Sequence, residues 1–235
     1  MADHHRFAAV EVDTDPTAAA AVDARSLYRF YHAGEEETLA LQGVSLQVEE
    51  GELVAVTGPS GSGKSTLLSW LAGMDEPDGG TVHIGGQRIS HRSERDRARI
   101  RAHHVGMLFQ SSNLLEHLSV KQNLALARSL VTRRSTHDLD LLGALGLAGR
   151  SGAYPSELSG GELARAGIAL ALVNSPTVLL ADEPTGELDS TTESQVLDLL
   201  IAATGRGTAI IVASHSAAVA AAATRVVRLE DGRAC

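Results

Sequence analysis

The sequence predicts an α/β fold: a mostly parallel sheet covered by helices, with an antiparallel β region near the N-terminus and an inserted helical subdomain. Two observations support this prediction. Short apolar runs such as Leu53–Val56 and Val178–Ala181 alternate along the chain with segments of helical period, as in βαβ units. Aromatic residues make up only 3% of the chain although 43% of it is apolar. The core must therefore consist of Ala, Val, Leu and Ile, which suits buried parallel strands.

The composition excludes several classes of protein. With 235 residues, the chain is long enough for one large domain or two small ones, and its formal net charge of −9 argues against a basic nucleic-acid binder. Arginines gather only between His91 and His104, where Glu94 and Asp96 lie among them, so we interpret that segment as a solvated helix face. Cys235 is the single cysteine, which excludes an internal disulfide and a cysteine-based metal site. With no apolar membrane span and no secretory signal apparent, we expect a cytoplasmic protein.

The N-terminal part divides into a tail and a β region. Residues 1 to about 23 lack hydrophobic periodicity, so we expect an unfolded tail before one domain over residues 24–235. Strand-like segments follow at Ser26–Tyr31 and Val44–Val48, with a polar loop expected over His32–Glu37. A turn at Pro77–Gly80 precedes a further short strand, Thr81–Ile84.

The segment that begins at Gly58 has the spacing of a phosphate-binding loop, because Gly63-Lys64-Ser65 follows at the required distance. Glycines let backbone N–H groups converge on one point, and the helix that follows aims its positive dipole end there. Lys64 would add a charge for the β- and γ-phosphates, and Ser65 a hydroxyl for Mg²⁺. A chance glycine turn is the alternative, and the flanking strand and helix argue against it. The residues expected to bind nucleotide are Gly58, Pro59, Ser60, Gly61, Ser62, Gly63, Lys64, Ser65 and Thr66.

Helical patterns dominate the middle of the chain. Between about residues 111 and 160, apolar residues recur at helical spacing and predict the inserted helical subdomain. Leu163–Val173 is almost entirely apolar, which predicts a buried helix. Ser190 followed by Glu193 is a capping-box pattern for the start of a later helix.

Polar residues follow the expected strands at the point where each strand ends. Gln110 follows Val105–Phe109, the pair Asp182-Glu183 follows Thr177–Ala181, and His215 follows Thr208–Ala213. The carboxyl ends of parallel strands line one crevice, so a single nucleotide site can recruit these groups together with Lys64. Ser159-Gly160-Gly161 is a second glycine-rich helix N-terminus, and hence a second surface suited to phosphate.

In this order and spacing, the motifs resemble those of the ATP-binding cassette (ABC) ATPases, and the resemblance covers the chain from about Ala24 onward. The matching segments are Gly58–Thr66 (Walker A), Gln110 (Q-loop), Leu158–Glu162 (signature), Val178–Asp182 with Glu183 (Walker B and catalytic acid), Gly186–Asp189 (D-loop) and His215 (switch histidine). Within this P-loop NTPase family, three further segments resemble the branch that serves lipoprotein release and macrolide export. They are Tyr31 with Ala33–Thr38, Pro184–Gly186, and Phe109-Gln110 with Asn113–Leu115.

The resemblance implies ATP as substrate and Mg²⁺ as cofactor. Asp182 would hold Mg²⁺ through water, with Ser65 and Gln110 as further ligands. Glu183 would polarise the attacking water, and His215 would donate a hydrogen bond to the γ-phosphate. Because adjacent residues on a strand face opposite ways, Asp182 and Glu183 can share a site only if the strand ends there.

The remaining expected contacts are to adenine and across a dimer. Tyr31 would stack on adenine, although Tyr28 and Phe30 compete for that role. In the family, the signature of one chain closes on the Walker A nucleotide of another, which implies a head-to-tail homodimer, or a heterodimer with a related ATPase. The further nucleotide-binding residues implied by the resemblance are Ser159, Gly160, Gly161 and Asp189. A separately encoded membrane permease would contact the helical subdomain and hold the ATPase at the inner face of the membrane.

Three residues depart from the family pattern. Glu162 stands where Gln is usual, Leu170 where Arg is usual, and Ser216 where Asp usually follows the switch histidine. The expected catalytic set is intact, so we predict hydrolysis, with the departures affecting its rate and the contacts of the signature.

Alternatives to a transport ATPase, expected in export or lipoprotein traffic, come from other functional classes. A regulatory ATPase of the cell-division type, whose permease-like partner controls an envelope enzyme without transport, would share every motif. Soluble ABC proteins of translation or DNA repair carry two cassettes or a long coiled coil, and neither occurs in this chain. A GTPase is disfavoured because the sequence lacks an Asn-Lys-x-Asp motif.

Overall fold

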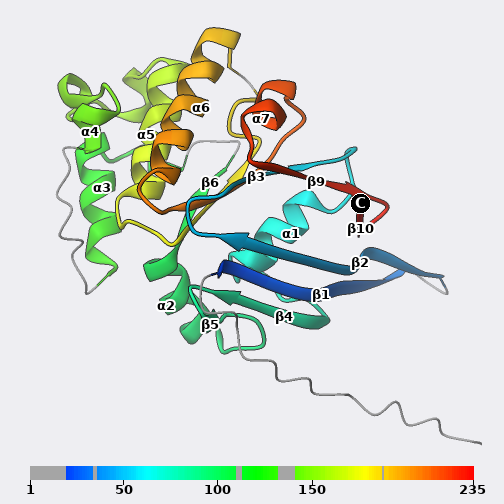
Figure 1. The fold of residues 1–235 in the computed structure, drawn as a ribbon. Coiled ribbons are helices and arrows are strands. Elements are labelled where there is room, and N and C mark those ends of the chain that lie inside the picture. Colours follow the sequence, from blue (N-terminus) through cyan, green and yellow to red (C-terminus); the bar gives the residue numbers. More distant parts are fainter. Residues whose placement is uncertain (1–19, 34–35, 110–112, 132–140, 187) are drawn as a thin grey trace, which may run out of the picture.

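The computed structural model describes residues 20–33, 36–109, 113–131, 141–186 and 188–235, with the backbone alone described for 30–33 and 36–40. Ten strands and seven α-helices form in these residues (Figure 1). The strands are β1 Ala20–Ala33, β2 Glu36–Glu49, β3 Leu53–Thr57, β4 Gly79–Ile84, β5 Gln87–Arg88, β6 Val105–Leu108, β7 Val178–Asp182, β8 Ala209–Ala213, β9 Arg225–Glu230 and β10 Arg233–Ala234. The helices are α1 Lys64–Leu71, α2 Glu94–His104, α3 Val120–Ser129, α4 Leu141–Ala144, α5 Gly160–Leu172, α6 Ser190–Thr204 and α7 Ala217–Ala222.

A six-stranded sheet in the order β10-β9-β3-β8-β7-β6 forms the centre of the molecule. All of its pairs are parallel except the edge pair of β9 and β10. Side chains of β3, β7 and β8 are buried on both faces, because helices or a second sheet cover each side. The predicted parallel core of small aliphatic residues is therefore confirmed.

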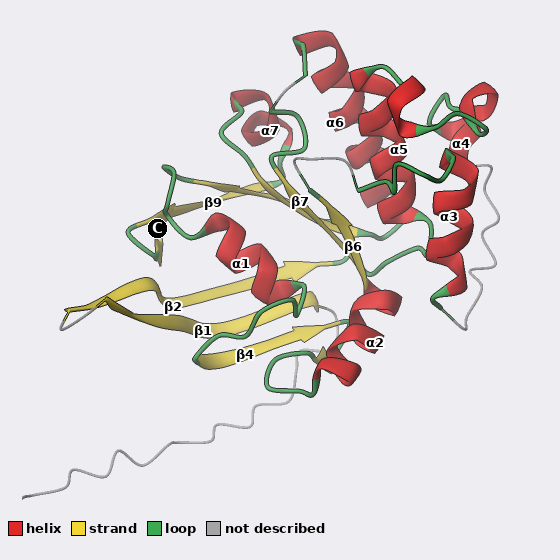
Figure 2. Ribbon diagram, turned by 180° about the vertical axis from the view of Figure 1, so that it is seen from behind, coloured by secondary structure: helices red, strands yellow, loops and turns green. Residues whose placement is uncertain are grey.

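The second sheet is antiparallel, in the order β2-β1-β4-β5, and faces the parallel sheet with α1 between them (Figure 2). One apolar core joins these layers and includes Val54 and Val56 of β3, Leu180 of β7, and Trp70 of α1, all fully buried. Helix α1, which follows the phosphate-binding loop, is thus fixed from both sides. The main force that holds α1 there is the burial of apolar surface, which contributes about 25 cal/mol for each Å² removed from water.

Helices cover the opposite face of the parallel sheet. Ala55, Leu179 and Ile210 point into a second core, to which α3, α5, α6 and α7 contribute. Helix α5 approaches β6 closely, since a Cβ on Gly106 would lie 2.3 Å from the carbonyl oxygen of Ala171. Helices α3 and α4 lie between β6 and β7 in the chain, where the inserted helices were expected.

Two expectations about the N-terminal region are wrong in detail. Residues 20–23, assigned to an unfolded tail, belong to β1. Ala21 and Val22 are buried in the apolar core that joins the two sheets. The segment His32–Glu37 is not one polar loop, since His32 pairs with Glu37 and Ala33 with Glu36 as β1 and β2 continue. Cross-strand pairing in a long hairpin outweighs the local polarity of these residues.

Helix α2 has the solvated character that its charges predicted, with no fully buried residue. Arg97 and Arg101 pair with Glu94 on the same helix. In the described part of the chain, no helix is both long and apolar enough to cross a membrane.

Replacing Leu180 with alanine should lower the free energy of unfolding by about 2–5 kcal/mol, because it leaves a cavity in a fully buried central strand. Chemical denaturation measures this change. Leu130→Ala is the matched control: Leu130 is 67% exposed, so its replacement should change the same quantity by less than about 0.5 kcal/mol. Equal effects of the two substitutions would contradict the assignment of the core.

Candidate nucleotide site

The register of the parallel sheet places the strand ends in one row. Asp182 of β7 lies opposite Ala213 of β8, and Ala213 lies opposite Val56 of β3. Gly58, Glu183 and His215 follow these residues within two positions. The structure therefore brings the glycine-rich loop, the acidic pair and His215 to one edge of the sheet.

The glycine-rich loop has a backbone that other residues rarely adopt. Gly58, Gly61 and Gly63 have φ angles of 148°, 79° and 99°. A Cβ at Gly58 would lie 2.1 Å from the carbonyl oxygen of Leu229, so only glycine fits beside β9. Gly63 is the N-cap of α1 and supplies no side-chain cap, which leaves the N–H groups of the first turn without a side-chain partner.

Lys64 is buried, and its ammonium group contacts the loop itself. Its Nζ donates hydrogen bonds to the carbonyl oxygens of Gly58 and Pro59, at 2.9 and 3.0 Å. Among the described residues, the buried Oγ of Ser62 has no hydrogen-bond partner. A cation, an unpartnered hydroxyl and helical N–H groups at one loop fit a phosphate chain. Ser60 and Ser65 are exposed, and Thr66 is half-buried on α1.

The acidic pair lies where β7 ends. Asp182 is the last residue of β7, and Glu183 turns out of the strand with a φ of 48°. A left-handed backbone at a residue other than glycine costs about 1–3 kcal/mol, and such residues are enriched at functional sites. The backbone N–H of Glu183 is still held at the sheet, by a hydrogen bond to the carbonyl oxygen of Ala213 at 2.9 Å. This turn frees Glu183 from the strict alternation that would send its side chain away from that of Asp182.

The carboxylate of Glu183 is oriented by the segment that follows β8. Ser214 donates a hydrogen bond from Oγ to Glu183 Oε2 at 3.1 Å, and the backbone N–H of His215 donates to the same oxygen at 3.4 Å. The other oxygen, Oε1, lies 3.1 Å from His215 Nε2, which makes an ion pair when the imidazole is protonated. The His215 side chain is 58% exposed. Sequence reasoning did not single out Ser214, whose signal is only its place between a strand and His215.

The second glycine-rich turn caps α5. Ser159 Oγ accepts a hydrogen bond from Glu162 N, and Glu162 Oε2 accepts one from Ser159 N, at 3.3 and 2.9 Å. Glu162 also pairs with Arg150 at 3.0 Å. The Ser159 N–H lowers the pKa of the Glu162 carboxyl, and Arg150 adds to this effect. The departure at Glu162 thus completes a capping box that sequence reasoning overlooked, although Ser-x-x-Glu is visible in the sequence.

The glycines of this turn leave its outer surface open. Ser159 and Gly160 are exposed, and a Cβ on Gly160 would meet nothing within 4 Å. Gly161 faces inward, because its Cβ would lie 2.9 Å from Thr192 Cγ2 at the start of α6.

The predicted capping box of Ser190 and Glu193 is wrong. Asp189 is the N-cap of α6, and its Oδ1 accepts hydrogen bonds from the N–H groups of Thr191 and Thr192 at 3.0 and 3.1 Å. A carboxylate one residue earlier competes successfully for these donors. Glu193 instead accepts hydrogen bonds from Thr185 and Ser216.

The side chains of two predicted site residues lie outside the described part of the structure. Gln110 lies outside the described residues. Tyr31 belongs to β1, where it pairs with Thr38, and its side chain also lies outside the described part. Across the described ranges, no group of three or more His, Cys, Asp or Glu is placed to hold a metal ion. The hydroxyl of Ser65 and the carboxylate of Asp182 are nevertheless the oxygen donors that Mg²⁺ prefers.

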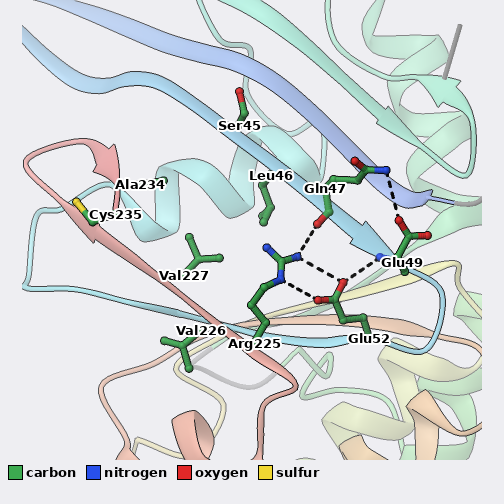
Figure 3. Close-up of a pocket in the computed structure, with 10 residues that line it drawn as sticks. All are labelled: Ser45, Leu46, Gln47, Glu49, Glu52, Arg225, Val226, Val227, Ala234 and Cys235. Carbon is green, nitrogen blue, oxygen red and sulfur yellow. Dashed lines mark hydrogen bonds and ion pairs between the residues drawn. The ribbon is translucent and has the colours of Figure 1, made fainter. Parts of the chain in front are cut away.

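A pocket between β2 and β9 lies elsewhere (Figure 3). Its lining includes Glu52, which precedes β3, and Arg225, the first residue of β9, so it lies toward the opposite ends of the strands. Arg225 donates hydrogen bonds to Glu52 Oε1 at 2.9 Å and to the carbonyl oxygen of Gln47 at 2.6 Å. These charges satisfy one another, so the pocket is not the candidate site.

Comparisons with known proteins agree with the geometry. The family described as "ABC transporter" matches residues 41–186. The chain therefore belongs to the ABC transporter family, as an ATP-binding cassette ATPase that resembles macrolide-export ATPases.

Individual relatives agree with this assignment. The macrolide export ATP-binding/permease protein MacB of Burkholderia thailandensis is 41% identical over 87% of this chain, which spans only 32% of that relative. An ABC transporter ATP-binding protein of Methanocaldococcus jannaschii, MJ1508, is 39% identical over 90% of this chain and 96% of its own.

Solved structures match as well. The dimeric structure of MJ0796, a bacterial ABC transporter cassette, has a TM-score of 0.81 at 33% identity and covers 91% of this chain and 96% of its own. A dimeric post-hydrolysis state of the same cassette, bound to ADP and Pi, has a TM-score of 0.80 over the same shares of both chains.

Replacing Asp189 with alanine should lower the thermal midpoint at neutral pH, because α6 loses its cap. Hydrogen bonds from Thr192 hold the pKa of the Asp189 carboxyl below its ordinary value. The ionised form therefore stabilises the fold above the unfolded-state pKa of about 4, and this contribution is lost as the pH falls through the lower folded-state value. Thermal unfolding at a series of pH values should show the difference shrinking in acid.

Asp189→Asn is the matched control for this prediction. It keeps an acceptor oxygen for the Thr191 and Thr192 N–H groups and should retain most of the midpoint at neutral pH. A difference between the parent and Asp189→Ala that is constant from neutral to acidic pH would show that ionisation of Asp189 does not stabilise α6.

Proposed function

We propose that this chain is the ATP-hydrolysing subunit of a transporter, and that ATP binding, dimer closure and hydrolysis drive a separately encoded permease. The observation that carries this proposal is the convergence of the phosphate-binding loop, Asp182-Glu183 and His215 at one sheet edge. The chain covers 96% of MJ1508, which is described as an ABC transporter ATP-binding protein, and this supports a permease in another chain.

In the proposed reaction, ATP is the substrate and its phosphates lie against the loop from Gly58 to Thr66. Lys64 would exchange its two carbonyl contacts for phosphate oxygens, and Ser62 Oγ would gain a partner. Ser65 and Asp182 would hold Mg²⁺, with Gln110 as a further ligand. The metal supplies charge neutralisation on the transferring phosphoryl group. Tyr31 is proposed to stack on adenine.

Glu183 is the proposed general base. Ser214 and the His215 N–H hold one of its oxygens, which leaves Oε1 and the His215 imidazole as the groups that face the reaction. A positioned base contributes about 10²–10⁴-fold to rate. His215 would donate to the γ-phosphate oxygens, where negative charge develops, and backbone N–H groups of the loop would stabilise the same charge.

The site is proposed to be completed by a second chain. Ser159 and Gly160 are exposed at the N-terminus of α5, and Gly161 faces Thr192, whose hydroxyl donates a hydrogen bond to Asp189. This turn is suited to phosphate, and the cassette MJ0796 is described as dimeric. A head-to-tail dimer, of two copies or of this chain with a related ATPase, would place the turn on the partner's nucleotide. The permease would hold the dimer at the inner face of the membrane, in export or lipoprotein traffic.

Glu183→Gln should keep ATP binding and reduce turnover by at least about 10²-fold, trapping an ATP-bound dimer. The amide preserves the hydrogen bond from Ser214 but removes the charge that polarises water. Phosphate release and size-exclusion chromatography with light scattering measure turnover and dimer. Glu50→Gln, in an exposed turn before β3, is the control and should behave as the parent. Hydrolysis at the parent rate would refute the role of Glu183.

Lys64→Ala should lose nucleotide affinity, because the loop would lack its only charged contact to phosphate. Isothermal titration calorimetry with ATP measures the change. Lys121→Ala removes an exposed lysine of α3 and should leave the affinity unaltered. If Lys64→Ala bound ATP as tightly as the parent, the phosphate-binding assignment of the loop would be wrong.

A further inference from the structure

One carboxylate joins two segments of the site. Glu193, in the first turn of α6, accepts a hydrogen bond from Thr185 Oγ1 at 3.0 Å and another from Ser216 Oγ at 2.6 Å, both on Oε1. Thr185 follows the acidic pair, and Ser216 follows His215. We infer that Glu193 is a positioning residue for ATP hydrolysis, which holds His215 and Glu183 in fixed relation. This inference rests on the proposed function.

The two segments are tied at both ends. Next to the ends of β7 and β8, Ser214 Oγ donates a hydrogen bond to Glu183 Oε2 at 3.1 Å. At the outer end, Thr185 and Ser216 share Glu193 Oε1. His215 lies between the ties, with its imidazole 3.1 Å from Glu183 Oε1 although 58% of the side chain is exposed. An exposed side chain keeps one position only if its backbone is fixed, and Glu193 supplies the outer attachment.

The attachment is anchored in the core. Thr185 is buried, while Glu193 and Ser216 are half-buried. Val196 and Leu197, on the same helix as Glu193, are buried in the core that covers the parallel sheet. Glu193 therefore connects the segment that carries His215 to a helix that cannot shift without disturbing that core. In effect, α6 sets the distance between the two segments.

The hydroxyl at position 216 matches this arrangement. A serine hydroxyl has one hydrogen and two lone pairs. Ser216 donates its hydrogen to Glu193 and accepts from the N–H groups of Ala218 and Val219, at 3.1 and 3.4 Å, as the N-cap of α7. An aspartate there would also cap α7, but it has no hydrogen for Glu193 and would face it with a second negative charge. Ser216 and Glu193 are therefore a matched pair, which gives the departure at Ser216 a physical reason.

Glu193→Ala should lower kcat for ATP hydrolysis about tenfold and leave KM unchanged. A tenfold change is about the size expected when the hydrogen bonds that orient the two segments are lost. Glu193→Gln keeps an acceptor oxygen for both hydroxyls and should stay within about threefold of the parent. Thr204→Ala, which removes a hydroxyl at the far end of α6, is the matched control and should keep the parent kcat. A merely structural role would lower stability without this split between kcat and KM.

A charge exchange tests the pair independently of the alanine variant. Ser216→Asp should lower kcat about tenfold, since two carboxylates would face each other. Adding Glu193→Gln should restore kcat to within about threefold, because the amide donates to the new carboxylate. A parent kcat in Glu193→Ala, or no recovery in the double variant, overturns the inference. If Glu183→Gln abolishes turnover in the same assays, such a result leaves the proposed function standing.

Discussion

The whole site depends on where β7 ends. Strand geometry sends consecutive side chains to opposite faces, so Asp182 and Glu183 can serve one reaction only if the second leaves the strand. The chain achieves this with a left-handed backbone at Glu183, whose φ is 48°. The backbone N–H of Glu183 keeps its bond to Ala213, so the turn is abrupt without freeing the residue from the sheet. The glycine-rich loop and His215 lie at the same edge as this turn, because β3 and β8 end beside β7.

Two cores support this edge from opposite sides. Helix α1 lies between the two sheets with Trp70 fully buried, so the phosphate-binding loop has a fixed end. On the other face, α5 and α6 carry the second glycine-rich turn and Glu193 on helices buried in the second core. Several groups at the edge also contact one another or their own loop: Lys64 donates to carbonyl oxygens of its loop, and Glu183 contacts Ser214 and His215. Phosphate binding would replace contacts of Lys64 in a loop that is already folded.

Much of this arrangement was predictable, because its signals are local. The apolar runs at β3, β7 and β8 predicted buried strands of a parallel sheet, and the glycine spacing after Gly58 indicated phosphate binding. Tertiary signals were harder to recognise. Asp189 and Ser190 are adjacent and both suit an N-cap, so the pattern with Glu193 pointed to the wrong residue, and the true partners of Glu193 are eight and twenty-three positions away. The strand over residues 20–23 was missed since its burial depends on β2 and β4.

We propose that one ATP site is built from two chains, and the dependence of hydrolysis on protein concentration tests this proposal most directly. The rate of phosphate release per chain, at saturating ATP and Mg²⁺, should rise with the concentration of the chain and then level off as dimers form. In the proposed dimer, Ser159 and Gly160 would meet the nucleotide of a partner. A rate per chain that stays constant across a wide dilution series, in samples that light scattering shows to be monomeric, would contradict the account.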